Sequence, residues 1–127
     1  MAKIKIDPAS PHPAVRQIVD ALRVELVDGR LKPGDELPSV RRAAIDLDLH
    51  FNTVAEAYRQ LADEGWLELR HGRSARVADR EQPKASRQTI QGFRQRLREL
   101  VSQMRAAGIP ENHIVDELLQ MARGNKP

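Results

Sequence analysis

Several residue types are scarce in this sequence, and each scarcity excludes a class of protein. The 127 residues contain no cysteine, which excludes disulfide bonds, thiolate metal ligands and cysteine nucleophiles. Only four residues are aromatic, too few for a platform on which single-stranded bases stack. No apolar run approaches the roughly 18 residues of a membrane span, and the first ten residues lack the apolar core of a secretory signal. We therefore expect a cytoplasmic protein without a membrane partner.

Motifs that support catalysis or metal binding are also missing. The four histidines are not spaced four residues apart from one another, as a helical metal site would require. Neither a GxGxxG nor a GxxxxGK[ST] string occurs, and the acidic residues are scattered among basic ones. We expect neither an enzyme nor a protein with a metal or a cofactor.

The charge is basic but evenly spread. The net charge is +3, and 16 of the 21 basic residues are arginine, the side chain best suited to bidentate contacts with phosphate and guanine. Residues 1–37 carry six basic and six acidic groups, residues 38–80 carry seven of each, and residues 81–127 carry eight against five. The total is therefore a weak indication of nucleic-acid binding, which local clustering must decide.

The first half of the chain has the apolar spacing of three helices. Residues 3–7 alternate, which indicates a short strand or an extended arm, and SPHP at 10–13 interrupts regular structure. The first helix follows and ends at Gly29, and LKPGDELP at 31–38 forms a turn. Ser39 caps a short second helix, and a third runs from about 51 to 64. Their predicted inward faces are Val15, Ile18, Val19, Leu22 and Leu26; Val40, Ala43, Ala44 and Leu47; and Val54, Ala57, Tyr58 and Leu61.

A β-hairpin is predicted next, and it concentrates positive charge. WLELR at 66–70 and ARV at 75–77 alternate like paired strands around an HGRS turn, with Trp66 expected in the core. The segment 69–80 holds one acid and four arginines, namely Arg70, Arg73, Arg76 and Arg80. Two helices joined tightly at 47–49 and followed by such a hairpin fit a winged helix-turn-helix. The second of the two helices would enter a major groove, while the hairpin reaches the flanking backbone or minor groove.

The last third of the chain predicts a helical hairpin. EQPKAS at 81–86 is a polar linker, so we divide the chain into a DNA-binding domain at 1–80 and a tail at 81–127. Gly108 and Pro110 separate two helices within 86–123. The first carries a heptad seam, and the second has an apolar face. The predicted dimerisation residues are Ile90, Phe93, Leu97, Leu100 and Met104 on the first helix, and Ile114, Leu118 and Met121 on the second.

An ordered set of motifs between 11 and 78 resembles a known family. LKPGDELPSVR (31–41), NTV (52–54), AYRQL (57–61), EGWL (64–67) and HGR (71–73) are similar to the DNA-binding domain of the GntR family of bacterial transcription regulators. The NTVxxAY string and the two-helix tail resemble the YtrA-like subfamily, whose members carry a short dimerisation tail. The resemblance implies a mainly α fold with a small β wing, and a repressor that occludes a promoter as a homodimer.

Four positions depart from the family pattern. Arg42 stands where a glutamate would complete a capping box with Ser39. His50 and Phe51 replace the usual pair before the NTV string, and Ala55 replaces an arginine that reads guanine in many members. These departures leave the fold expectation intact and the operator sequence undetermined.

The resemblance and the charge pattern together give the predicted DNA contacts. Arg41 and Arg42 begin the second helix, Asn52 and Thr53 open the recognition helix, and Arg59 lies on its exposed side. At the hairpin, His71 and Gly72 resemble the family's minor-groove contact, and Arg73 and Arg76 are expected on phosphate.

Several of these residues also have a purely structural interpretation. Asn52 serves equally well as a helix cap, and Phe51 either touches a thymine methyl or packs over the turn. We expect Glu56 to pair with Arg59 or Gln60 rather than to read a base. A DNA-binding regulator competes with two other functions, a protein-interaction module and a sensor whose unknown small-molecule effector binds at the dimer interface or linker. Steep salt dependence of duplex binding would separate the first two.

Overall fold

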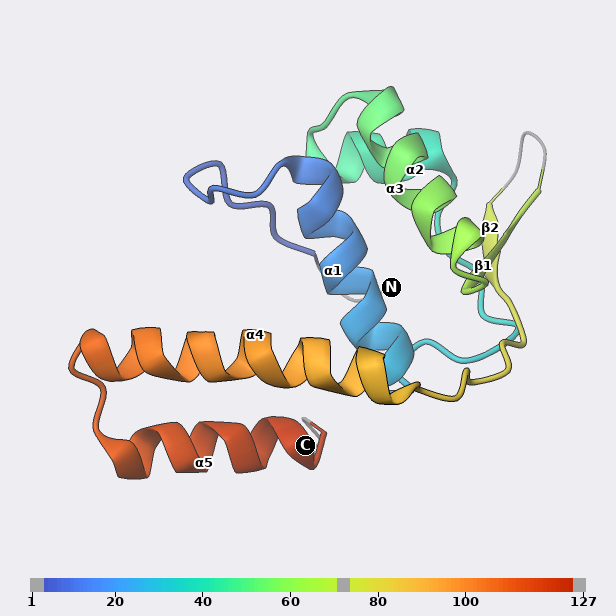
Figure 1. The fold of residues 1–127 in the computed structure, drawn as a ribbon. Helices are drawn as coiled ribbons and strands as arrows, with labels where there is room; N and C mark the ends of the chain where they lie inside the picture. The colour runs from blue at the N-terminus through green and yellow to red at the C-terminus, as the bar shows by residue number, and fades with distance from the viewer. Residues whose placement is uncertain (1–3, 71–73, 125–127) are drawn as a thin grey trace. The chain divides into compact units, whose positions relative to one another are not determined.

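The computed structural model describes residues 4–70 and 74–124, which contain five helices and a two-stranded antiparallel sheet (Figure 1). It divides into two compact units, Met1–Glu81 and Gln82–Pro127. The elements of the first unit are α1 (Ala14–Val27), α2 (Val40–Leu47), α3 (Phe51–Asp63), β1 (Leu67–Leu69) and β2 (Ala75–Val77). Those of the second are α4 (Arg87–Ala106) and α5 (Glu111–Ala122). The predicted fold class, mainly α with a β-hairpin wing, is confirmed.

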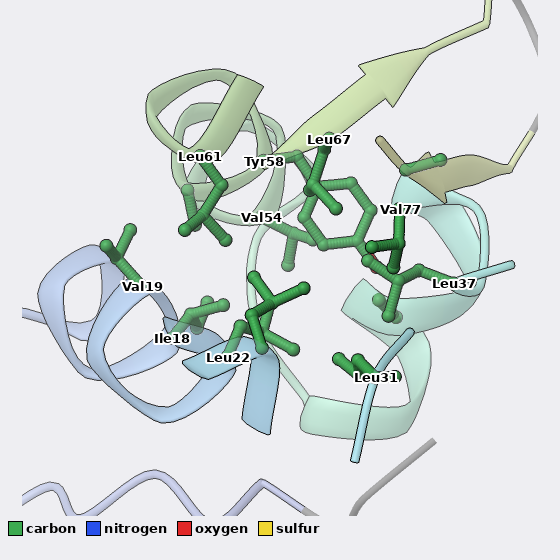
Figure 2. Packing of buried hydrophobic residues seen from close by; sticks show 14 of the residues in the cluster. Ile18, Val19, Leu22, Leu31, Leu37, Val54, Tyr58, Leu61, Leu67 and Val77 are labelled. Carbon is green, nitrogen blue, oxygen red and sulfur yellow. The ribbon is translucent and has the colours of Figure 1, made fainter. Parts of the chain in front are cut away.

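The three N-terminal helices and the sheet enclose one apolar core (Figure 2). Leu61 of α3 faces Ile18 and Leu22 of α1, and the ring of Tyr58 lies beside Val77 of β2. Each helix presents the face that its spacing predicts, because residues three and four apart share one side of a helix. Burying about fifteen apolar side chains supplies the main driving force for folding of this unit.

A single left-handed residue makes the turn between α2 and α3. Asp48 has φ 55°, and the backbone N–H of Leu49 donates to the carbonyl of Ala44 at 2.9 Å. Aspartate tolerates this conformation better than most residues do. At the other end of α2 the N–H of Arg42 donates to Ser39 Oγ at 3.1 Å, so the serine cap forms although its reciprocal glutamate is absent.

The wing contains three adjacent backbone segments joined by hydrogen bonds, whereas the sequence predicts two. β1 and β2 pair in the register Leu67 with Val77 and Leu69 with Ala75. The segment 34–37, which we predicted only as a turn, runs along the other edge of β2. The N–H of Leu37 donates to the carbonyl of Ala75 at 2.8 Å, and a bridge joins Glu36 to Arg76. The wing is thus attached directly to the segment that leads into α2.

Two smaller predictions concern the N-terminal segment and Trp66. The described residues 4–7 form no strand, which leaves the extended-arm alternative, and Ile4 and Ile6 pack against the core. Trp66 lies just before β1, is half-buried and packs against the core, while Arg80 lies over its ring at 4.1 Å from the centroid.

The tail is a helical hairpin with little interior. Helices α4 and α5 run antiparallel beside each other, joined through Gly108 at φ 86° (Figure 1). Pro110 lies one residue before α5. Helix α4 buries none of its 20 residues, and Ile114 is the one buried side chain of α5. Within the described residues no helix is both long and apolar enough to cross a membrane.

Candidate nucleic-acid interface

Helix α3 has one face in the core and presents its first turn to solvent. Asn52 is exposed and Thr53 is half-buried. His50 caps the helix, since its Nδ1 accepts a hydrogen bond from the backbone N–H of Asn52 at 3.1 Å. The capping interpretation of Asn52 is therefore wrong, because His50 occupies that position and leaves the Asn52 side chain outside the cap. Both predicted polar residues lie where the second helix of a helix-turn-helix meets base edges.

Tyr58 fixes this helix to the segment before α2. Its hydroxyl donates to the carbonyl of Pro38 at 2.9 Å, and its ring lies in the core at 2% exposure. Burial raises the pKa of Tyr58 to about 12, so the hydroxyl stays protonated and able to donate at neutral pH. Because Pro38 directly precedes the α2 cap, this bond joins α3 to the start of α2 in addition to their core packing.

The opposite end of α3 is joined to α1 by an ion pair. Arg23 donates to both Glu64 oxygens, at 3.1 Å from Nε and 2.7 Å from Nη2, and also contacts Asp20 at 3.2 Å. The hydrogen bonds that Arg23 donates to Glu64 raise the pKa of Arg23 above its ordinary value. Arg80 donates to the carbonyl of Glu64 at 2.9 Å. We grouped Arg80 with the DNA-facing wing arginines, but the structure directs it inward to the end of α3 and to Trp66.

The cations on the helix-turn-helix differ in whether an acid already neutralises them. Arg42 pairs with Asp46 at 3.3 Å, and Arg59 pairs with Glu56 at 3.5 Å. The predicted structural role of Glu56 is thus confirmed. Arg41 is exposed, and no carboxylate among the described residues pairs with it. Of the arginines predicted on these helices, Arg41 is the one with an uncompensated charge.

The structure describes only part of the predicted wing contacts. His71, Gly72 and Arg73 lie outside the described residues. Arg76 is half-buried in β2, on the side opposite Ala75 and Val77. It pairs across the sheet with Glu68 of β1 and, on its other side, with Glu36. These acids reduce the positive potential that Arg76 offers to a phosphate. Arg70 is exposed directly after β1, a wing position that the predicted contacts do not include.

The tail presents its predicted seam to solvent. Ile90, Phe93, Leu97 and Leu100 are each about half exposed, and Met104 is partly covered. The predicted dimerisation residues of α5 differ from one another in exposure. Ile114 is 3% exposed and Leu118 is half-buried, so these two side chains belong to the tail's own packing, whereas Met121 is largely exposed. Val115 and Leu119 are also outward apolar residues of α5.

A groove of about 370 Å³ lies along the tail, open to solvent. Its lining combines three arginines with apolar side chains, namely Arg94, Leu97, Arg98, Val101, Ser102, Arg105 and Leu118. The groove is open rather than enclosed, because two helices are too few to surround such a space. Among the residues described, no group of three or more histidine, aspartate or glutamate side chains could hold a metal ion.

Two features of the site were missed at the level of sequence. The first is the His50 cap, since histidine is not among the residues that commonly cap helices. The second is a surface hollow at the turn, lined by Arg41, Ala44, Ile45, Asp48, Leu49 and Phe51. The spacing of α2 indicates only that Ile45 is exposed, because Ile45 lies off the inward face that Ala44 and Leu47 define.

Comparison with known proteins gives the same assignment as the geometry. Residues 14–77 match the family of bacterial regulatory proteins named for GntR. The HTH-type transcriptional repressor YtrA of Bacillus subtilis is 32% identical over 84% of this chain and 82% of its own. An uncharacterised HTH-type transcriptional regulator of the same organism, YhcF, is 34% identical over 91% of this chain and 94% of its own.

A solved structure of the same family covers most of the chain. YtrA from Sulfolobus acidocaldarius, a GntR-family transcription factor, superposes with a TM-score of 0.58 and 34% identity, covering 81% of this chain and 97% of that one. The matches include relatives of nearly this length, which is the pattern of the short YtrA-like members. The chain belongs to the GntR family of bacterial regulatory proteins and is a YtrA-like member of it.

Proposed function

We propose that this protein is a sequence-specific DNA-binding transcription regulator that represses by occluding a promoter. The observation that carries the proposal is the surface around the first turn of α3. Asn52 and Thr53 lie there with the uncompensated Arg41, on a helix held in place by the core and by Tyr58. The repressor role is supported by the similarity to YtrA, a transcriptional repressor. Such a regulator acts where the bacterial chromosome is, in the cytoplasm.

We propose further that it acts as a homodimer through the tail. A contiguous exposed apolar seam is unfavourable in water, and a second copy is its commonest cover. Two-fold symmetry would place two copies of α3 at half-sites about one helical turn apart. Each half-site contact is then strengthened by the high effective concentration of the second. The relatives are transcription regulators, and we assign the chain no catalytic activity.

Selection of bound fragments from random duplexes, followed by footprinting, tests the function. We expect a defined operator whose affinity falls steeply between about 50 and 200 mM salt, since phosphate contacts release counterions. Selection of no sequence, or affinity that salt does not change, would instead favour a protein-interaction module.

One substitution pair tests the surface that carries the proposal. Arg41→Ala should weaken operator binding by about 1–3 kcal/mol if the guanidinium reads a base. Arg16→Ala is the matched control, because it removes the same charge from α1, where Arg16 pairs with Asp20 at 3.6 Å. Equal losses in the two variants would exclude Arg41 from the interface.

A further inference from the structure

The hollow at the helix-turn-helix turn combines apolar side chains with a charged one. Ile45 comes from α2 and is 67% exposed, and Phe51 is the first residue of α3 and is 49% exposed. Arg41, one turn earlier on α2 than Ile45, lines the same hollow. The apolar surface is therefore contiguous with the one uncompensated arginine of the motif.

The fold does not require these apolar side chains. Neither Ile45 nor Phe51 belongs to the core cluster or to the partly buried residues packed against it. Phe51 lines the hollow beside the turn residues Asp48 and Leu49, and half of its surface remains exposed to a ligand. A single exposed apolar side chain needs no explanation, but two that line one hollow beside the recognition helix lie where a ligand is expected.

The position of Phe51 limits what the hollow can bind. In a helix-turn-helix the N-terminal residues of the second helix contact base edges in the major groove. A phenyl ring offers no hydrogen bond, so it cannot distinguish guanine, cytosine or adenine by their donors and acceptors. The apolar group in the major groove is the C5-methyl of thymine, which apolar side chains contact.

We infer that this hollow reads thymine, with Phe51 in contact with the C5-methyl group and Arg41 on the adjacent backbone or base edge. The inference rests on the proposed function, and it adds one specified base per half-site. Arg41 supplies the attraction to the phosphate backbone, and the Phe51 ring distinguishes thymine from the other bases. A second copy of the chain or a small apolar molecule in the hollow is the competing occupant.

The test removes only the methyl group. In the selected operator, each thymine is replaced singly by deoxyuridine, which pairs identically but lacks the C5-methyl. We expect one position per half-site at which this change weakens binding about four-fold, the effect of losing one buried methyl. In Phe51→Ala, binding should be weaker and the deoxyuridine substitution at that position should have no further effect.

Two further variants keep the result interpretable. Phe51→Leu retains an apolar contact and should retain part of the sensitivity to deoxyuridine. Val27→Ala is the matched control, since Val27 is an exposed apolar residue of α1 outside the hollow, and it should retain the full sensitivity. Thermal unfolding of each variant verifies that the winged unit is intact.

The possible failures are distinguishable. If no duplex is selected, the proposed function itself fails. If a specific operator is found but deoxyuridine changes nothing at any position, thymine reading is wrong and DNA binding stands. If the deoxyuridine effect persists in Phe51→Ala, another residue contacts the methyl and the assignment to Phe51 is overturned.

Discussion

The two units of this protein handle apolar residues in opposite ways. In the winged unit, fifteen apolar side chains form a closed cluster, and residues such as Leu22 and Leu61 have no exposed surface. In the tail, a helix of 20 residues buries nothing, and Phe93 remains 59% exposed. The first unit holds its fold by its own core, whereas the second presents its apolar residues outward. The difference indicates that the tail's hydrophobic energy is available for association rather than for folding of one chain.

The most severe test of this difference between the two units is a charge placed on the apolar seam of α4. Leu100→Lys should abolish the proposed dimer, because burying an ammonium group in an apolar interface without a partner is highly unfavourable. Without the linked second half-site, operator affinity should fall by about 10²- to 10⁴-fold. Sedimentation equilibrium at micromolar concentration measures the first effect, and titration of a two-half-site duplex measures the second.

Gln95→Lys is the control for this variant. It adds the same charge to the exposed polar side of α4, where Gln95 contacts Glu99 at 3.1 Å. It should leave both the oligomeric state and the affinity unchanged. A Leu100→Lys protein that is still dimeric would show that the seam is not the interface.

The structure also shows which kinds of feature a sequence reveals. The faces of α1 and α3, the Ser39 cap and the strand pairing around the wing were all predictable, because each depends on residues a few positions apart. The pairing of segment 34–37 with β2 joins residues about 40 positions apart, and no local pattern indicates it. Likewise, a count of wing arginines could not show that Arg80 turns inward to Glu64.

The candidate site was predicted less completely than the fold for the same reason. Family motifs located the first turn of α3 and Arg41, but neutralisation of Arg42 and Arg59 depends on where Asp46 and Glu56 point. In the tail, heptad spacing correctly placed Phe93 and Leu100 on one face. It could not divide α5 into inward Ile114 and outward Val115, because both belong to one broad apolar stripe.

Matched leucine-to-alanine substitutions sharpen the contrast between the units. Leu61→Ala removes a fully buried side chain and should lower the free energy of unfolding of the winged unit by about 2–5 kcal/mol. Leu100→Ala should leave that unfolding transition in place and weaken association instead. Urea denaturation followed by the fluorescence of Trp66, the one tryptophan in the chain, reports on the winged unit alone. Equal shifts of the midpoint would contradict the division into independent units.

The alkaline limit of stability should depend on the same core. Tyr58 has its pKa raised by burial from 10.0 to about 12, so its phenol stays protonated in the folded state at a pH where the unfolded chain ionises. This contribution is fully present below pH 10 and is lost as the pH rises toward about 12, amounting to on the order of 2 to 3 kcal/mol.

The measurement is simple because Tyr58 is the one tyrosine in the chain. Tyrosinate absorbance should rise only near pH 12 in the folded protein, and near pH 10 once urea has unfolded it. Tyr58→Phe, which lacks the ionising group, should remove this alkaline destabilisation. A folded-state transition near pH 10 would mean that the ring is not buried as described.

The smallest expected effect compares one cap chemistry in the two units. Ser39 Oγ accepts from the N–H of Arg42 at the start of α2, and Ser86 Oγ accepts from the N–H of Thr89 at the start of α4, both at 3.1 Å. Loss of a serine cap costs about 1 kcal/mol of helix stability.

In Ser39→Ala that loss should appear in the unfolding of the winged unit reported by Trp66, since α2 contributes Ala43 and Ala44 to the core. In Ser86→Ala the Trp66 transition should be unchanged, because the cap belongs to the other unit and its loss would only fray the start of α4. A shift of about 1 kcal/mol in the Trp66 transition of Ser86→Ala would show that the two units unfold together.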